Sequence, residues 1–563
     1  MKHRKVDVKY AGQFVPHRDN SINYINVPLS DLSVGINFTD NHIIKISQQH
    51  QVEWITSRIC DHANGTLQSC NDKSIAECPL HGWKLDLETL TYTNVSVKKE
   101  QIPFTTDGNN LQIEHQNLSL ELPEDISSNQ SSAPLEIRFL AHASLEFICG
   151  DIKIITDPWL QGPCFLNAWW HSPTPADDVI EKLLSADVIY ISHNHPDHFH
   201  LETLQILFKH NPDILIITPN FQSKSAELPI RSIGFTNVRP LPFNQLFRID
   251  SDVVISILKS GDFRDDSGLF IGYGKKQALI TVDASTLNQL ILPKDIDFLA
   301  TSFAEGASGY PWCFDDYSEA KKTDIMNVRN NASKQWILDY IAATEPSAYM
   351  PYAGYFTESA PRDSYMKLNN KKVTRSEVKD WIKSYDANIT FIDPLLSDKI
   401  VIGETITFHS EGKGKLEEET KDTVERYIQS EKKASIELLK KLVPDYFINS
   451  KFKDQLKVYL LLCDDDFKEV GPYFIIDFSV SPPTCKHIDS LQEILNCYQH
   501  ATSSERNLLI RVRINLFSDV IENYKSWEEL SIGFHCRIHR KPDIYNSDFW
   551  YHFSNIYIHQ FDA

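Results

Sequence analysis

The pattern of apolar and polar positions divides the chain into parts with different periodicities. Residues 22–122 consist of short segments in which apolar and polar residues alternate, such as HIIKIS, separated by Asn, Asp and Gly. A period of two predicts strands that bury one face, so we expect an antiparallel β domain here. Residues 123–134 are polar, begin and end with proline and have no periodicity, which is typical of a linker.

The middle of the chain has continuous apolar runs instead of alternation. Runs such as LEIRFL, IKIITDP, DVIYISH and QALITVD have the length of buried strands, and helical stretches such as PADDVIEKLLSA separate some of them. This order predicts stacked layers of helix and sheet. A charged, glycine-containing stretch after His409 ends this part of the chain.

The last part of the chain has a third pattern. A helical period in TVERYIQSEKKASIELLKKLV is followed by strand-like runs such as KVYLLLCD, which predicts an α+β domain without metal-ligand spacing. A chain of 563 residues is also too long for one core, since domains have about 100–200 residues. We therefore expect a multidomain α+β protein with domains at residues 1–125, 126–410 and 411–563.

Charge and composition exclude some classes of function. The formal net charge of −20 argues against a long nucleic-acid footprint, which needs a basic face. The chain has no apolar run of about 18 residues, and its first residues lack the apolar core of a secretory signal. We expect a cytoplasmic protein that acts on a small molecule and has no membrane or nucleic-acid partner. Two of the ten cysteines belong to one motif, and the other eight show no paired spacing and are expected to be reduced.

That motif consists of Cys60-x-His62 and Cys78-x-x-His81. Each loop supplies one thiolate and one imidazole, which is the ligand set of a Rieske [2Fe–2S] cluster. We predict that Cys60 and Cys78 bind one iron and that His62 and His81 bind the other. A Cys₂His₂ zinc site is the alternative, but zinc fingers usually pair the two cysteines together and the two histidines together.

A second motif, His193-x-His195-x-Asp197-His198, follows the buried run DVIYIS. Histidines and a carboxylate at the end of such a strand are typical of the metal loop of a metallo-β-lactamase-type αββα sandwich. Asp283 ends the run QALITVD, where that superfamily carries a bridging carboxylate. The alternative is a solvated cluster of histidines on the surface that binds no metal.

The second motif lacks later ligands that hydrolytic members of this superfamily use. Residues 259–264 and 350–356 contain no histidine. What remains is His193, His195 and Asp283, the composition of a facial triad that binds non-haem Fe(II) and leaves positions open for O₂. We predict that these three residues are catalytic and that Asp197 and His198 form a second site or support the first, so the iron is mononuclear or dinuclear. Zinc cannot accept electrons from a Rieske cluster, which favours iron.

Several other histidines, tryptophans and basic residues lie near these motifs in sequence. His142 is expected to support a ligand, and His171 and His200 are not expected to bind metal. Trp169 and Trp170 either stack on a substrate or belong to the core. An anionic substrate would need cationic partners. The candidates are the basic residues nearest the site loops in sequence, which are Arg231, Arg239, Lys259 and Arg264.

The order of motifs resembles that of the CMP-N-acetylneuraminate hydroxylase family. The resemblance includes the second metal motif, Thr281–Asp283, Gly306–Pro311 and Pro351–Phe356, and it covers most of residues 55–370. It implies a Rieske-dependent non-haem iron monooxygenase that hydroxylates the N-acetyl group of a nucleotide sugar. The cosubstrate would be O₂, and the electrons would come from a reductase, a ferredoxin or a cytochrome b5-type protein.

Three alternatives remain open at the level of sequence. The first is a Rieske oxygenase that acts on another small metabolite, such as an amine N-oxygenase. The second is a metal-dependent hydrolase in which the Rieske domain senses redox state. The third is an electron carrier joined to a domain that has lost its metal.

Overall fold

We describe a computed structural model of the chain. It describes residues 4, 6–18, 23–62, 65–70, 72–79, 82–93, 97–115, 118–127, 133–250, 252–262, 264–304, 309–396, 399–409, 417–502 and 505–561.

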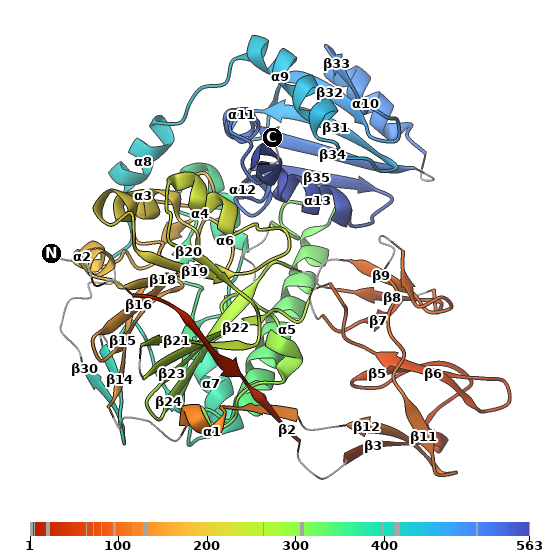
Figure 1. Ribbon diagram of the computed structural model, residues 1–563. Helices are drawn as coiled ribbons and strands as arrows, with labels where there is room; N and C mark the ends of the chain where they lie inside the picture. The colour runs from red at the N-terminus through yellow and green to blue at the C-terminus, as the bar shows by residue number, and fades with distance from the viewer. Residues whose placement is uncertain are drawn as a thin grey trace.

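Two eight-stranded sheets lie face to face in the middle of the molecule (Figure 1). The first contains, in spatial order, β1 (Lys9–Gln13), β21 (Gln245–Asp250), β22 (Val253–Lys259), β23 (Ser267–Tyr273), β24 (Lys276–Ile280), β25 (Phe298–Ser302), β26 (Ala348–Tyr352) and β28 (Thr390–Phe391). The second contains β20 (Val238–Leu241), β19 (Leu215–Pro219), β18 (Val188–Tyr190), β16 (Ile152–Thr156), β15 (Ser144–Cys149), β14 (Leu135–Ala141), β29 (Lys399–Ile402) and β30 (Ile406–His409).

The apolar runs of the middle part form the core between these sheets. One buried cluster joins residues of the second sheet, such as Ile154 and Val188, to residues of the first, such as Ile255 and Phe298. Separate apolar clusters place helices on the outer faces. Helices α2 (Val179–Leu184), α3 (Leu201–His210) and α4 (Glu227–Ile233) cover the second sheet, and α5 (Glu319–Thr344) and α7 (Arg375–Tyr385) cover the first. The result is an αββα sandwich.

Small antiparallel sheets occupy the N-terminal part, as the alternation of residues 22–122 predicts. They contain β4 (Gly35–Phe38), β5 (His42–Ile46) and β6 (Val52–Ser57); β10 (Thr91–Tyr92), β9 (Trp83–Asp86), β8 (Ile75–Cys78) and β7 (Gln68–Ser69); and β11 (Phe104–Thr106), β12 (Asn110–His115) and β3 (Asn23–Pro28). Strand β2 (Val15–Arg18) pairs with β13 (Leu118–Glu121), which precedes α1 (Glu124–Ser127). The preceding strand β1 pairs with β21, so it belongs to the central sandwich and not to these sheets.

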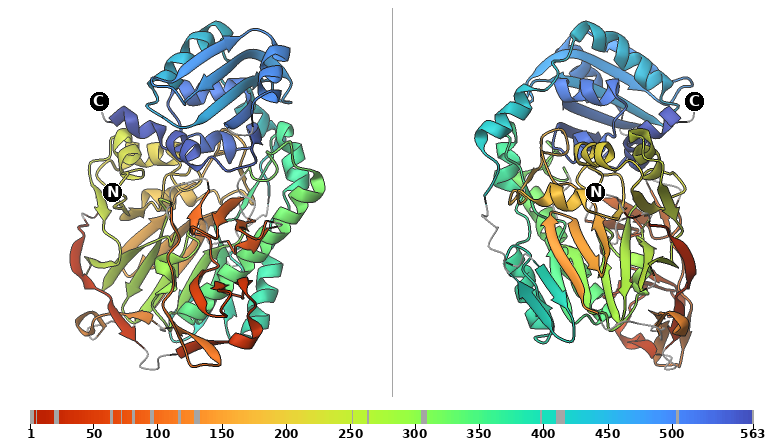
Figure 2. Two further views of the ribbon diagram at one scale, coloured as in Figure 1. Left: turned by 90° about the vertical axis from the view of Figure 1, so that its right-hand side faces the viewer. Right: turned by 60° about the vertical axis from the view of Figure 1, so that its left-hand side comes forward.

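The C-terminal part has a five-stranded mixed sheet of its own. Its strands are β33 (Thr484–Ile488), β32 (Glu469–Asp477), β31 (Leu456–Cys463), β34 (Arg506–Arg513) and β35 (Cys536–Lys541). Helix α8 (Lys421–Gln429) precedes this part and packs against Trp170 and Ala360 of the sandwich. The helices of the C-terminal part are α9 (Ile436–Asn449), α10 (Leu491–Gln499), α11 (Ile514–Glu522), α12 (Glu528–Ser531) and α13 (Ser547–Ser554), followed by the 3₁₀ helix η4 (Ile556–Phe561). Figure 2 shows this part resting on one end of the sandwich.

Helix α5 lies between the sandwich and the N-terminal sheets (Figure 1). Ala332 and Trp336 of this helix pack against the buried cluster that contains Cys60 and Cys78. The helix has 26 residues, but neither it nor another helix in the described ranges is long and apolar enough to cross a membrane.

A buried ion pair holds the C-terminal part to the sandwich. Arg513 Nη1 donates to Asp363 Oδ1 at 2.6 Å, and both side chains are 1% exposed. We expect Arg513→Met to lower the free energy of unfolding by about 3–5 kcal/mol, because Asp363 would stay buried without its partner. The denaturant midpoint of the first unfolding transition measures this loss.

The exposed pair Lys294–Glu345 provides the control. Its side chains are 43% and 53% exposed, so Lys294→Met is expected to cost at most about 1 kcal/mol. Equal midpoints for the two variants would contradict a structural role for the Arg513 pair.

Candidate metal centres

The loop after strand β18 carries most of the second motif. The strand is buried along its length and lies parallel to both neighbours, β16 and β19, so its carboxyl end opens at an edge of the sheet. The chain turns there, because the N–H groups of His198 and Phe199 both donate to the carbonyl of His195, at 2.9 and 2.7 Å. Helix α3 begins directly after this turn.

His193, His195 and Asp283 form a first group of potential ligands. One ligand atom of each lies within 4.8 Å of the others, and His193 Nε2 is 2.8 Å from His195 Nδ1. Asp283 reaches the group from the facing sheet, since it follows β24. The structure thus brings together the three residues that the sequence predicts to be catalytic.

His142, Asp197 and His198 form a second group with the same spacing. His142 Nε2 is 3.2 Å from Asp197 Oδ2. The sequence predicts only a supporting role for His142, whereas the structure places its ring in a potential ligand set. The physical reason is that His142 directly follows β14, which ends at the same side of the sheet as β18. Its position after the buried run LEIRFLA is the sequence signal that could have identified it.

One nitrogen atom joins the two groups. His198 Nε2 lies 3.3 Å from Asp197 Oδ2 and 3.4 Å from Asp283 Oδ2. Burial opposes protonation, but the two carboxylates raise the pKa of His198 well above its usual value. Burying two carboxylates close together is unfavourable unless a positive charge compensates them, and a metal ion supplies such a charge. The residues therefore fit one metal ion or a pair of ions.

Asp157 orients this part of the site. Its carboxylate is 2.8 Å from both the N–H and the hydroxyl of Ser192 and 3.0 Å from His198 Nδ1. A carboxylate that accepts a hydrogen bond from one ring nitrogen of an imidazole fixes the tautomer, and the other ring nitrogen is then free to bind a metal. His198 therefore presents Nε2 to the two groups.

The histidines that the sequence excludes have other contacts. The ring of His171 stacks on Trp159 with a centroid distance of 3.9 Å. The ring of His200 accepts the backbone N–H of Thr203 and caps α3. In the described structure, neither residue belongs to a potential ligand group.

Glu528 of the C-terminal part is a site residue that the sequence did not indicate. Its Oε2 is 3.1 Å from His195 Nε2. Burial opposes protonation of His195, but Glu528 and other nearby carboxylates raise the pKa of His195 to about 9. A lone glutamate in a short helix has no local signature, so no sequence signal could have found it.

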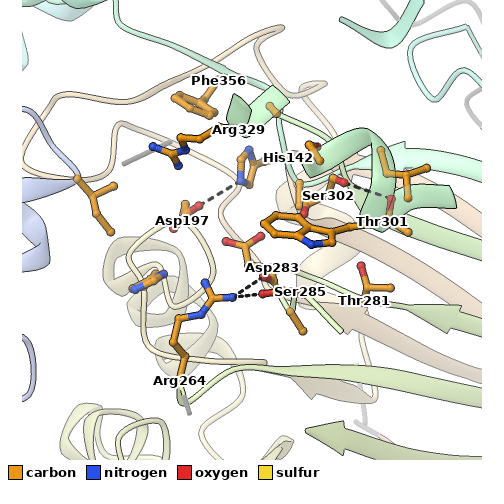
Figure 3. A pocket seen from close by; sticks show the side chains of 18 of the residues that line it. His142, Asp197, Arg264, Thr281, Asp283, Ser285, Thr301, Ser302, Arg329 and Phe356 are labelled. Carbon is orange, nitrogen blue, oxygen red and sulfur yellow. Dashed lines mark hydrogen bonds and ion pairs between the residues drawn. The ribbon is translucent and has the colours of Figure 1, made fainter. Parts of the chain in front are cut away.

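A cavity of about 180 Å³ opens onto both groups. Figure 3 shows His142, Asp197 and Asp283 directed toward one space, and beside it Arg264 donates a hydrogen bond to Ser285. The walls include Phe165, Trp169, Arg264, Thr301, Arg329, Trp336 and Phe356. The site therefore combines potential metal ligands, two cations and an aromatic wall.

Only one of the basic residues proposed from sequence lines this cavity. Arg264 donates to Asp262 at 2.9 Å and to Ser285 at 2.7 Å. The second cation, Arg329, was not among the predicted residues, since it lies on α5 far from the site loops in sequence. Trp169 stacks on Phe356 at 3.6 Å in the cavity wall, whereas Trp170 packs in a separate cluster with Ala360 and Val424.

The motif predicted to bind an iron–sulfur cluster belongs to the N-terminal sheets, since Cys60 lies between β6 and β7 and Cys78 ends β8. Cys60 and Cys78 are both fully buried, and a hydrogen bond between them lowers the pKa of the Cys60 thiol despite burial. His62 is buried and stacks on Trp83 at 4.4 Å, and burial lowers its pKa to about 3. Neighbouring thiols beside a neutral imidazole fit the donor set of a [2Fe–2S] cluster. His81, the fourth predicted ligand, lies outside the described residues.

A family model matches part of the central sandwich. Residues 136–249 match the family model of the Beta-lactamase superfamily domain. Among solved structures, the chain is similar to CmlA, a diiron β-hydroxylase from Streptomyces venezuelae, with 15% identity, 48% of this chain and 54% of that chain covered, and a TM-score of 0.34. It is also similar to the isothiocyanate hydrolase from Delia radicum gut bacteria, with 17% identity, 49% and 100% coverage, and a TM-score of 0.31.

Similarity over nearly the whole length defines the family. The cytidine monophosphate-N-acetylneuraminic acid hydroxylase of Macaca mulatta is 30% identical over 562 residues, with 94% of this chain and 92% of the relative covered. The protein of the same name from Asterias rubens is 29% identical over 520 residues, with 88% and 77% covered. The chain belongs to the cytidine monophosphate-N-acetylneuraminic acid hydroxylase family, and it is an oxygenase.

Proposed function

We propose that the protein hydroxylates the N-acetyl group of CMP-N-acetylneuraminic acid, using O₂ and electrons that enter through a Rieske [2Fe–2S] cluster. The observation that carries this proposal is the presence, in one chain of this family, of a buried Cys60–Cys78–His62 set and a separate His/Asp site. When bound, non-haem iron at the His/Asp site would activate O₂, and the cluster would supply electrons one at a time.

The ligands divide between two centres. Cys60, Cys78, His62 and His81 would hold the cluster. His193, His195 and Asp283 would hold the catalytic iron, and His142, Asp197 and His198 would hold a second iron in a dinuclear site. The outer partners Asp157 and Glu528 would keep the imidazoles His198 and His195 in place.

The cavity is suited to one end of the substrate. Pockets that enclose drug-sized ligands have about 300–1,000 Å³, so a space of about 180 Å³ takes the acetamido end and not the whole nucleotide sugar. The Trp169–Phe356 stack would exclude water from that end, and Arg264 or Arg329 would bind an anionic group of the substrate. The electron donor would be a reductase, a ferredoxin or a cytochrome b5-type protein.

Product mass tests the proposal. The purified protein is reduced without oxygen and then mixed with O₂ and CMP-N-acetylneuraminic acid. We expect a product heavier by one oxygen atom, formed only when reductant, O₂ and substrate are all present. Free N-acetylneuraminic acid serves as the matched substrate that lacks the nucleotide. Absence of the oxygenated product with a fully metallated protein would contradict the proposal.

Metal content is a second prediction. We expect about three or four irons per chain, since the cluster holds two and the His/Asp site holds one or two. Elemental analysis of the protein purified without oxygen measures this number. Two irons with zinc at the His/Asp site would instead support a hydrolase with a redox-sensing cluster.

A further inference from the structure

Phe356 has a partner on each face of its ring. The ring of Trp169 stacks on one face, with centroids 3.6 Å apart and planes 10° apart. The ammonium of Lys372 lies over the same ring, 3.5 Å from its centroid. Because Trp169 covers one face, the ammonium must lie on the other, where the π electrons of the ring attract a cation. The three side chains therefore form a stack in the order Trp169, Phe356, Lys372.

The backbone of Phe356 is held as well. Phe356 begins β27 (Phe356–Thr357), which pairs with β17 (Trp170–His171), the strand directly after Trp169. Lys372 Nζ donates to the carbonyl oxygen of Phe356 at 3.1 Å. One lysine thus contacts both the ring and the main chain of Phe356.

A buried carboxylate fixes Lys372 in turn. Its Nζ lies 3.0 Å from one carboxylate oxygen of Glu358 and 3.1 Å from the other. The side chains of Lys372 and Glu358 are 16% and 3% exposed, and Asn370 donates to the same carboxylate at 3.4 Å. The ammonium therefore has a defined position, unlike that of a surface lysine, whose charged end stays in water.

The two stacked rings belong to the wall of the cavity beside the potential metal ligands. Trp169 and Phe356 both line this cavity, and the ring of Phe356 lies 5.9 Å from the ring of His142. The proposed function places the acetamido end of the substrate in this space of about 180 Å³. Since both faces of Phe356 are covered, its ring cannot move aside without losing a partner. A fixed wall limits the length of the acyl group that fits.

We propose that Lys372 is a positioning residue that restricts the site to a short N-acyl group. It acts through Phe356 and not by contact with the substrate. A longer acyl group would have to displace Phe356, which would break the contact of the ammonium with the ring and its hydrogen bond to the carbonyl. This inference rests on the proposed function, because it requires the acetamido end to occupy the cavity.

Binding of two substrates that differ by one methylene tests the inference. The metallated protein is titrated calorimetrically without oxygen, with CMP-N-acetylneuraminic acid and with its N-propanoyl analogue. We expect the wild type to bind the N-acetyl compound about 10- to 200-fold more tightly. Lys372→Met combined with Glu358→Gln should lower this ratio to about 5-fold or less, because Phe356 can then move aside. The double change removes both charges, so no buried carboxylate is left without its partner.

Two further variants show whether the ammonium acts through the ring. Lys372→Arg keeps a cation over Phe356 and should keep the wild-type ratio. In a Phe356→Leu background, the Lys372/Glu358 double change should alter the ratio by less than about 2-fold, because the ring on which the ammonium acts is absent. A general loss of stability would weaken the binding of both substrates alike. An equal effect of the double change in both backgrounds would overturn the inference.

The ion pair of Lys276 and Asp297 provides the matched control. Lys276 Nζ lies 2.8 Å from Asp297 Oδ1, and the two side chains are 21% and 20% exposed. Lys276 begins β24, whereas Asp283 follows the other end of this strand. Lys276→Met combined with Asp297→Asn should therefore keep the wild-type ratio.

The outcomes separate this inference from the proposed function. Product mass with the N-acetyl substrate tests the proposed function, and binding without oxygen tests the role of Lys372 without turnover. If the wild type forms product but does not discriminate between the two substrates, or discriminates no better than the Lys372/Glu358 variant, only the role of Lys372 is wrong. If the metallated wild type binds neither substrate, both proposals fail.

Discussion

Replacing His195 with alanine is expected to abolish hydroxylation while the visible absorption of the iron–sulfur cluster remains. His195 belongs to the first ligand group and contacts both His193 and Glu528. Its loss would leave one imidazole and one carboxylate in that group, too few to hold a metal that supplies several kcal/mol of transition-state stabilisation. We expect turnover to fall by at least about 10³-fold, equivalent to about 4 kcal/mol.

Three measurements check this prediction. Product mass reports turnover, elemental analysis reports the iron at the second site, and visible absorption reports the cluster. His210→Ala is the control, because His210 is exposed at the end of α3 and lies in neither ligand group. Loss of the cluster from His195→Ala would show that the two centres do not fold independently. Full turnover in this variant would exclude His195 as a ligand.

Replacing Cys60 with serine is expected to remove the cluster and leave the second metal site intact. Cys60 is fully buried beside Cys78, and a hydroxyl is a poor substitute for a thiolate at iron. The variant should lose about two irons per chain. Turnover that depends on an external electron donor should become undetectable, because no other described centre connects that donor to the His/Asp site.

Cys70→Ser is the matched control for this prediction. Cys70 lies in the same part of the chain, but its Sγ is 3.7 Å from a carboxylate oxygen of Glu77, and burial raises its pKa. It is therefore not poised as a thiolate ligand. Cys70→Ser should keep the colour and the iron content of the wild type. The same loss of colour in both variants would argue against the assignment of Cys60 to the cluster.

Local sequence patterns predicted much of the fold and of the candidate site. His193, His195, Asp197 and His198 lie within six consecutive residues after a buried strand, so the turn that follows the strand brings them together wherever the strand lies. The alternation of residues 22–122 likewise predicts antiparallel pairing, because the side chains of a strand point to opposite faces in turn. The motif order also identified the family, which the full-length relatives confirm.

Other contacts depend on chain segments that are far apart. Glu528 meets His195 across 333 positions, and Arg329 reaches the cavity from a long helix with no nearby motif. Strand β1 joins the central sheet because its partner is β21, and alternation within a strand does not specify which edge it will pair with.

The sequence by itself predicted two kinds of metal chemistry, and it determined the layered αββα class and the family. Only the tertiary structure decided that His142 joins a ligand group, that Glu528 contacts His195 and that Tyr545 lies against His62. The reason is physical. Local backbone geometry determines how the side chains of one loop lie relative to one another, whereas contacts between distant segments depend on how separate cores pack against one another. Here the packing of helix α5 places Trp336 against the buried cluster of Cys60 and Cys78 and also in the wall of the cavity that Asp283 lines.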